Sequence, residues 1–153
     1  MLKARDMMNA EPPFCQLDTP VQDISQRFAS ESMSGILVID DKQRLLGVIT
    51  ESDLIDQQAK LHLPTAIALF DMVLPLGEEK FERELARMQA MVAEDLMTPG
   101  VQTVDADADL NRVSTLMTEE SIHHLPVIDG DMVIGLITRH EVIKALAGRL
   151  FAS

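Results

Sequence analysis

Residues 37–50 read LVIDDKQRLLGVIT, and residues 126–138 read PVIDGDMVIGLIT. Each stretch holds two apolar runs around a short polar connector, which is typical of two antiparallel strands joined by a turn. The two stretches begin about 89 residues apart, and the second is one residue shorter in its turn. An internal repeat at this spacing determines the fold, and it extends from the hairpin in both directions.

The repeat extends upstream of each hairpin. Arg5-Asp6-Met7-Met8 recurs as Glu94-Asp95-Leu96-Met97. A short β segment is expected at 14–17 in the first copy and at 101–104 in the second, followed by an amphipathic helix. Helix starts are marked by Thr19-Pro20 and by residues 107–109. One helix carries Val21, Ile24 and Phe28 on a single face, and the other carries Leu110, Val113, Leu116 and Met117.

A closing helix, 52–61 or 140–150, follows each hairpin. The sequence therefore predicts a fold of the α/β (α+β) class in which the order β-α-β-β-α occurs twice. We assign residues 1–62 to the first repeat, 63–93 to a helical inter-repeat segment, and 94–153 to the second repeat.

The inter-repeat segment is too long and too apolar for a simple flexible connection. Pro64 opens a short helical pattern, and Pro75 and Gly77 interrupt it. We expect an amphipathic helix over 78–92, whose apolar side consists of Phe81, Leu85, Met88 and Val92. This helix either packs on its own module or contributes to a dimer contact.

Composition and charge exclude several classes of function. The formal net charge of −12 disfavours binding to nucleic-acid phosphates, and the absence of Trp and Tyr removes common stacking side chains. The longest apolar runs are far shorter than the ~20 residues of a membrane span. Because the first residues lack a secretory pattern and Cys15 is the single cysteine, we expect a cytoplasmic protein without disulfides, nucleic-acid partners or membrane insertion.

Catalytic signatures are absent from the sequence. It contains no Gly-rich phosphate loop, no Gly-x-Ser-x-Gly elbow and no Cys/His cluster with metal-ligand spacing. His123-His124 is the one metal-like feature, and adjacent residues of a strand point to opposite faces. We therefore expect no enzyme, no catalytic residues and no metal site.

The duplicated blocks resemble those of tandem CBS-domain proteins, an arrangement called a Bateman module. The likeness rests on Asp6-Met7-Met8 and Asp95-Leu96-Met97, on Leu125-Pro126-Val127-Ile128-Asp129, and on the strand ends Gly47-Val48-Ile49-Thr50 and Gly135-Leu136-Ile137-Thr138. It implies two CBS repeats related by a pseudo-twofold axis, with two equivalent clefts between facing sheets. It also implies an adenosine-containing regulatory ligand, namely AMP, ADP, ATP or S-adenosylmethionine, and no obligatory cofactor.

The family's ribose-binding pattern is a Thr or Ser at the end of the last strand and an Asp three residues later. Thr50 and Asp53 match it, and in the second copy Glu141 follows Thr138 where the family has Asp. A carboxylate accepts hydrogen bonds from ribose hydroxyls, and a helix start offers backbone N–H groups to phosphate.

By the same resemblance, each ribose carboxylate faces the early strand of the other repeat. The first cleft then joins Thr50 and Asp53 to Gln102, Thr103 and Val104. The second joins Thr138 and Glu141 to Cys15, Gln16 and Leu17. We favour the first cleft for nucleotide binding, because its carboxylate fits the family pattern and Thr103 offers a hydroxyl.

Arg139, His123 and His124 are the expected phosphate contacts. The two histidines lie where nucleotide-binding relatives often place a His-Arg pair, although ordinary turn histidines are the alternative. Arg139 directly follows the strand end and has the fork geometry that suits phosphate. In the first copy, Ser34-Gly35 replaces the histidines and Glu51 replaces Arg139.

The resemblance thus implies a regulatory module that binds an adenine nucleotide or S-adenosylmethionine, forms a homodimer and signals to an effector protein. The alternative is a dimerisation or interaction scaffold that binds no ligand, because a fold does not by itself determine function.

Overall fold

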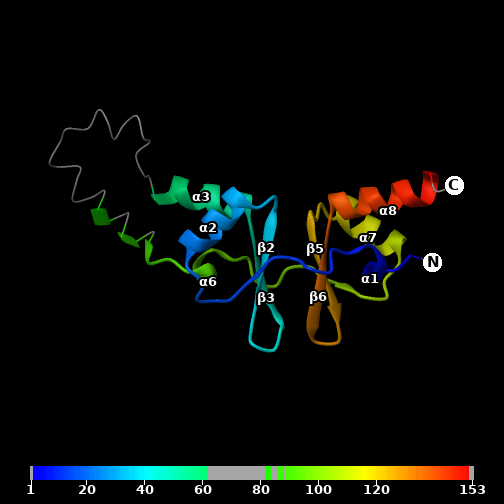
Figure 1. Ribbon diagram of the computed structural model, residues 1–153, viewed down its shortest axis with the longest axis horizontal. Coiled ribbons are helices and arrows are strands. Elements are labelled where there is room, and N and C mark those ends of the chain that lie inside the picture. The colour runs from blue at the N-terminus through cyan, green and yellow to red at the C-terminus, as the bar shows by residue number, and fades with distance from the viewer. Residues whose placement is uncertain (1, 62–81, 84–85, 88, 152–153) are drawn as a thin grey trace.

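The computed structural model describes residues 2–61, 82–83, 86–87 and 89–151. Its two halves have the same order of elements (Figure 1). The first half contains β1 (Phe14–Cys15), α2 (Val21–Ser30), β2 (Gly35–Ile39), β3 (Leu45–Thr50) and α3 (Glu51–Leu61). The second contains β4 (Val104–Asp105), α7 (Leu110–Glu119), β5 (His124–Asp129), β6 (Met132–Thr138) and α8 (Arg139–Phe151). The predicted β-α-β-β-α repeat is confirmed.

Each half builds a three-stranded sheet, in the order β1-β2-β3 or β4-β5-β6. The short first strand runs parallel to the middle strand, and the middle and last strands form the predicted antiparallel hairpin. Cys15 pairs with Val38, and Val104 pairs with Val127, so Cys15 and Val104 are equivalent positions.

The expected β segments at 14–17 and 101–104 were wrong in extent and register, since they matched Leu17 to Val104. The first strand ends at Cys15 because the next residue enters a turn, in which the Gln16 N–H donates to the Thr19 hydroxyl at 2.9 Å. The second begins only at Val104, because the chain before it is still crossing from the other half, where Thr98 bridges Val48.

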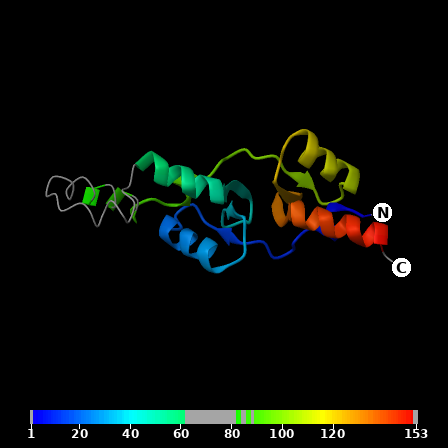
Figure 2. The ribbon, with the colours of Figure 1, turned by 90° about the horizontal axis from the view of Figure 1, so that it is seen from above.

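The helices cover the outer faces of the sheets, and the two sheets face each other in the middle of the molecule (Figures 1 and 2). The alternation of side chains along β2 explains why one face of the sheet contacts helices and the other face contacts the second sheet, because successive side chains of a strand point to opposite faces. Ile36 and Val38 are buried under the helices of their own half, whereas Leu37 packs with residues of the other sheet, including Val133 and Leu136.

Two short helices, α1 (Ala4–Met7) and α6 (Ala93–Leu96), are exchanged between the halves. Ala4 and Met7 are buried in the core of the second half, and Ala93 and Leu96 are buried in the core of the first. Isolated bridges repeat this exchange, joining Asn9 to Leu136 and Thr98 to Val48. Such reciprocity is what a pseudo-twofold relation between the repeats requires.

The Asp of each Asp-x-Met block has a structural role in these helices. The Asp6 carboxylate accepts a hydrogen bond from the Lys3 N–H at 2.9 Å, and the Asp95 carboxylate accepts one from the Val92 N–H at 2.8 Å. Both bonds satisfy a backbone donor at a helix start.

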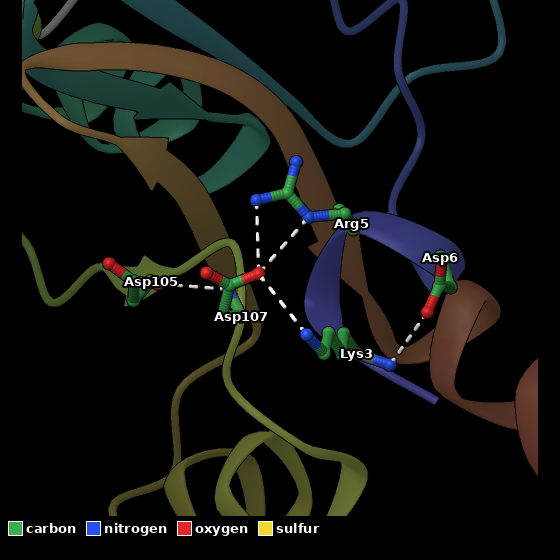
Figure 3. A network of polar contacts seen from close by, with 5 residues as sticks. All are labelled: Lys3, Arg5, Asp6, Asp105 and Asp107. Carbon is green, nitrogen blue, oxygen red and sulfur yellow. Dashed lines mark hydrogen bonds and ion pairs between the residues drawn. The ribbon is translucent and has the colours of Figure 1, made fainter. Parts of the chain in front are cut away.

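Charged side chains attach α1 to the second half (Figure 3). Arg5 donates through Nε and Nη2 to Asp107 Oδ1 at 3.2 and 3.0 Å, and Lys3 Nζ lies 3.6 Å from the same oxygen. The hydrogen bond from Arg5 is the main reason why the pKa of Asp107 lies below its usual value. All three groups are exposed, so the contact positions α1 more than it stabilises the fold.

Part of the expected inter-repeat helix lies outside the described residues, including Phe81, Leu85 and Met88, as do Pro64, Pro75 and Gly77. Its expected end at Val92 was wrong. Val92 is extended, with φ −122° and ψ 171°, and bridges Pro20. In the described part of the chain, no helix is long and apolar enough to cross a membrane.

Candidate functional site

The ends of β3 and β6 each hold a threonine bonded to a carboxylate in the first turn of the next helix. Asp53 Oδ2 accepts hydrogen bonds from the Thr50 N–H at 2.7 Å and from the Thr50 hydroxyl at 3.1 Å. Glu141 Oε2 accepts from the Thr138 N–H at 2.8 Å and from the Thr138 hydroxyl. The longer Glu141 side chain therefore makes the same pair of bonds as Asp53, each through one carboxylate oxygen.

A cleft of about 920 Å³ lies beside the Thr138–Glu141 pair and between the halves. That volume is within the usual range for a small-molecule site. Four parts of the chain line it: the end of β6 with the start of α8, the crossing segment with β1, the end of α2 with the loop to β2, and Glu51 at the start of α3. Phe14 and Phe28 contribute aromatic surface to it.

The residues predicted to face Thr138 and Glu141 lie elsewhere. Cys15 is buried in the core of the first half, where burial raises the pKa of its thiol to about 11. Leu17 packs against that core, and Gln16 is exposed in the turn after β1. Residues 11–14 line the cleft instead, in keeping with the equivalence of Cys15 and Val104.

The five residues predicted for the first cleft are partly brought together. Thr50 and Asp53 are hydrogen-bonded to each other. Thr103 lines a separate cavity of about 270 Å³, near the β5–β6 turn. Gln102 is exposed and donates to the carbonyl of Thr103 at 2.9 Å, while Val104 is buried in the core of the second half.

The predicted phosphate contacts separate into two environments. Arg139 Nε donates to His123 Nδ1 at 3.1 Å, and both side chains are exposed. His124 is half-buried, and its Nε2 lies 2.9 Å from the Ser34 hydroxyl of the other half. Burial is the main cause of the lowered pKa of His124, and the neighbouring His123 lowers it further.

The two histidines therefore have different partners, Arg139 for His123 and Ser34 for His124. Within the described ranges, no group of three or more His, Cys, Asp or Glu residues is placed to hold a metal.

Sequence reasoning missed the end of α2 as part of the cleft. Arg27 lies there, and it donates to the Phe14 carbonyl at 2.8 Å and to Glu31 at 3.0 Å. The sequence contained one indication of this contact, because Arg27 directly precedes Phe28 at the edge of the helix face that carries Val21 and Ile24. A guanidinium at such an edge reaches backbone groups of the next layer.

These features define a class of protein: a tandem β-α-β-β-α module with exchanged leading helices and ligand-sized space between facing sheets. The family model described as "CBS domain" matches residues 4–60 and 92–148. The chain belongs to the CBS-domain family, and the resemblance drawn from its repeated blocks is confirmed.

Known relatives agree with this assignment. The uncharacterized protein MJ1426 of Methanocaldococcus jannaschii is 29% identical over 93% of this chain and 89% of its own length. The chloroplastic CBS domain-containing protein CBSX2 of Arabidopsis thaliana is 28% identical over 83% of this chain and 55% of its own length. The crystal structure of CBSX2 in complex with AMP matches with a TM-score of 0.76 at 24% identity, covering 98% of this chain and 99% of that one.

Proposed function

We propose that this CBS pair is a regulatory module that binds an adenosine-containing ligand between its repeats and transmits the binding to a partner protein. The observation that carries the proposal is the Thr–carboxylate pair at each strand end, one of which borders a cleft of about 920 Å³. In each pair one carboxylate oxygen holds the threonine, so the carboxylate is fixed in place at the start of a helix. A carboxylate fixed in this way is a suitable acceptor for ribose hydroxyls.

The relatives support the same ligand class. CBSX2 is similar to this chain in sequence, and its crystal structure is of a complex with AMP. The proposal extends that ligand class, but not any particular contact, to the clefts of this protein.

We assign phosphate-bearing ligands to the surface around Thr50 and Asp53, at the end of β3 and the start of α3. The His124 ring lies against Gly35, which pairs with Thr50 across the hairpin. Arg139 extends this polar surface through its contact with His123. A guanidinium held near a helix start is a favourable partner for phosphate.

The second part of the proposal is that the protein forms a homodimer. Among the residues whose side chains the structure describes, large apolar side chains are exposed on the closing helices at Ile55 of α3 (68%) and at Ile143 and Leu146 of α8 (63% and 39%). Both helices lie along the same side of the molecule (Figure 1). This surface also favours the second candidate function, a dimerisation scaffold that needs no ligand.

Calorimetric titration of adenosine, AMP and ATP into four variants tests the ligand proposal. Asp53→Ala should weaken AMP at least about tenfold, because ribose hydroxyls lose a charged acceptor. Arg139→Ala should weaken ATP more than adenosine, and less so at high salt. Glu141→Ala should affect the tightest nucleotide site less than Asp53→Ala. Asp56→Ala, an exposed change on the same helix as Asp53, is the control and should leave affinity unchanged.

The scaffold would be the better account if wild-type protein gave neither heat nor a melting shift with adenosine, AMP, ATP or S-adenosylmethionine. Equal losses for Asp53→Ala and Glu141→Ala would instead show that the two clefts are used alike.

A further inference from the structure

The two closing helices begin with opposite charges. Glu51 is the first residue of α3, and Arg139 occupies the equivalent place at the start of α8. Glu51 lines the cleft of about 920 Å³, together with Ser34 and Gly35. The positions in the second repeat that are equivalent to Ser34 and Gly35 are His123 and His124. The second repeat therefore has basic side chains at these positions, whereas the first repeat, which contributes Ser34 and Gly35 to this cleft, has none.

The whole lining of this cleft carries an excess of negative charge. Its carboxylates are Glu11, Glu31, Glu51 and Glu141, and among the described residues the only Arg or Lys that lines it is Arg27. Arg27 is already engaged, since its guanidinium bonds to Glu31 at 3.0 Å and to the Phe14 carbonyl at 2.8 Å. An approaching phosphate would therefore be repelled by these carboxylates, because bringing like charges together costs free energy. This repulsion would disfavour ligands that carry phosphate.

The same cleft retains what an adenosine moiety needs. Thr138 and Glu141 form the pair at the strand end, and Phe14 and Phe28 offer half-buried aromatic surface to an apolar ring. The acidic rim adds attraction for a ligand that carries positive charge.

We infer that the Thr138–Glu141 cleft selects uncharged or cationic adenosine compounds over adenine nucleotides, and that Glu51 is the residue that determines this selection. The inference rests on the proposed function and goes further, because it assigns different ligand charges to the two Thr–carboxylate pairs that the repeat makes equivalent. The Glu51 carboxylate offsets the partial positive charge at the start of α3, where free backbone N–H groups would otherwise favour phosphate.

The test uses the Asp53→Ala protein as the background, because binding at the Thr50–Asp53 pair is weakened there and this cleft accounts for more of the remaining binding. Calorimetry with adenosine, S-adenosylmethionine, AMP and ATP should give the tightest binding for the first two and the weakest for ATP. Glu51→Arg, which copies Arg139, should tighten ATP at least about tenfold and change adenosine less than about twofold. Glu51→Gln should have an intermediate effect, and all gains for ATP should shrink as salt rises.

Glu94→Arg is the matched control. Glu94 is exposed on α6 and outside the cleft lining, and its replacement changes the net charge of the protein by the same amount. It should leave the ratio of ATP to adenosine affinity unchanged.

Four results would overturn the inference. Tighter binding of ATP than of adenosine in the Asp53→Ala background, or an equal shift from Glu94→Arg and Glu51→Arg, would remove the role of Glu51. Loss of all binding in Asp53→Ala protein, with wild type still binding AMP, would show that this cleft is unused while the proposed function stands. If wild type bound none of the four compounds, both proposals would fail together.

Discussion

At the scale of single residues, Gly47 and Gly135 explain how the exchanged segments cross the hairpins. A Cβ atom on Gly47 would lie 2.7 Å from Met97 Sδ and 3.0 Å from the Thr98 carbonyl oxygen. On Gly135 it would lie 2.9 Å from the Asn9 carbonyl oxygen and against the Met8 side chain. Because the close atoms include backbone, a larger residue would have to displace the incoming chain. Both repeated blocks therefore need glycine at this place.

Gly135→Ala should lower the free energy of unfolding by about 1–3 kcal/mol, since it overpacks a fixed contact. Denaturant titration measures the change. Gly148→Ala is the control, because nothing lies within 4 Å of a Cβ at that position of α8. It should be neutral or stabilising by up to about 1 kcal/mol. If both variants had the same stability, the crossing contact would not constrain the fold.

The pair at the end of β6 shows what residue identity can and cannot predict. The sequence identified Thr138 and Glu141 as equivalent to Thr50 and Asp53, and the structure makes the same hydrogen bonds in both pairs. The sequence did not predict whether Glu141, with its extra methylene, would make the same hydrogen bonds as Asp53, because this depends on where the backbone places the start of the helix.

At the scale of elements, periodicity identified the hairpins and long helices, because each side of a strand or helix meets one environment along its whole length. The exchange of α1 and α6 was not predictable in this way. Four residues carry too little pattern, and their partners lie in the other half. The register of β1 was missed for a related reason, since two paired residues leave no alternation to read.

Matched truncations test the exchange. Met7→Ala should accelerate hydrogen exchange first in β5 and β6, whereas Leu96→Ala should do so first in β2 and β3. The two side chains are 7% and 8% exposed, and each truncation of a buried side chain should cost about 2–5 kcal/mol. Faster exchange of β2 and β3 in the Met7→Ala protein would contradict the exchanged packing.

At the scale of the whole molecule, the facing sheets bury a third apolar cluster, formed by Leu37, Val48, Val133 and Leu136. This cluster joins the two repeats into one unit. The apolar surface of α3 and α8 points away from it, and we proposed above that a second copy covers this surface.

Ile143→Glu should convert the dimer to a monomer, because a carboxylate would be desolvated in an apolar contact. Light scattering at micromolar concentration measures the mass. Met132→Glu is the control, since Met132 is 45% exposed in the β5–β6 hairpin rather than on the closing helices. A monomeric wild type would contradict the dimer, and dissociation by Met132→Glu alone would move the interface to the other end of the molecule.

The central claim is that an adenosine-containing ligand binds between the repeats. Backbone amide chemical shifts, recorded while adenosine is titrated into the wild-type protein, test it most directly. The account predicts that the largest changes occur at the strand ends, residues 50–53 and 138–141, and along residues 11–14, which line the cleft between the halves. Unchanged spectra at millimolar adenosine, or changes confined to the outer helices and hairpin turns, would contradict it.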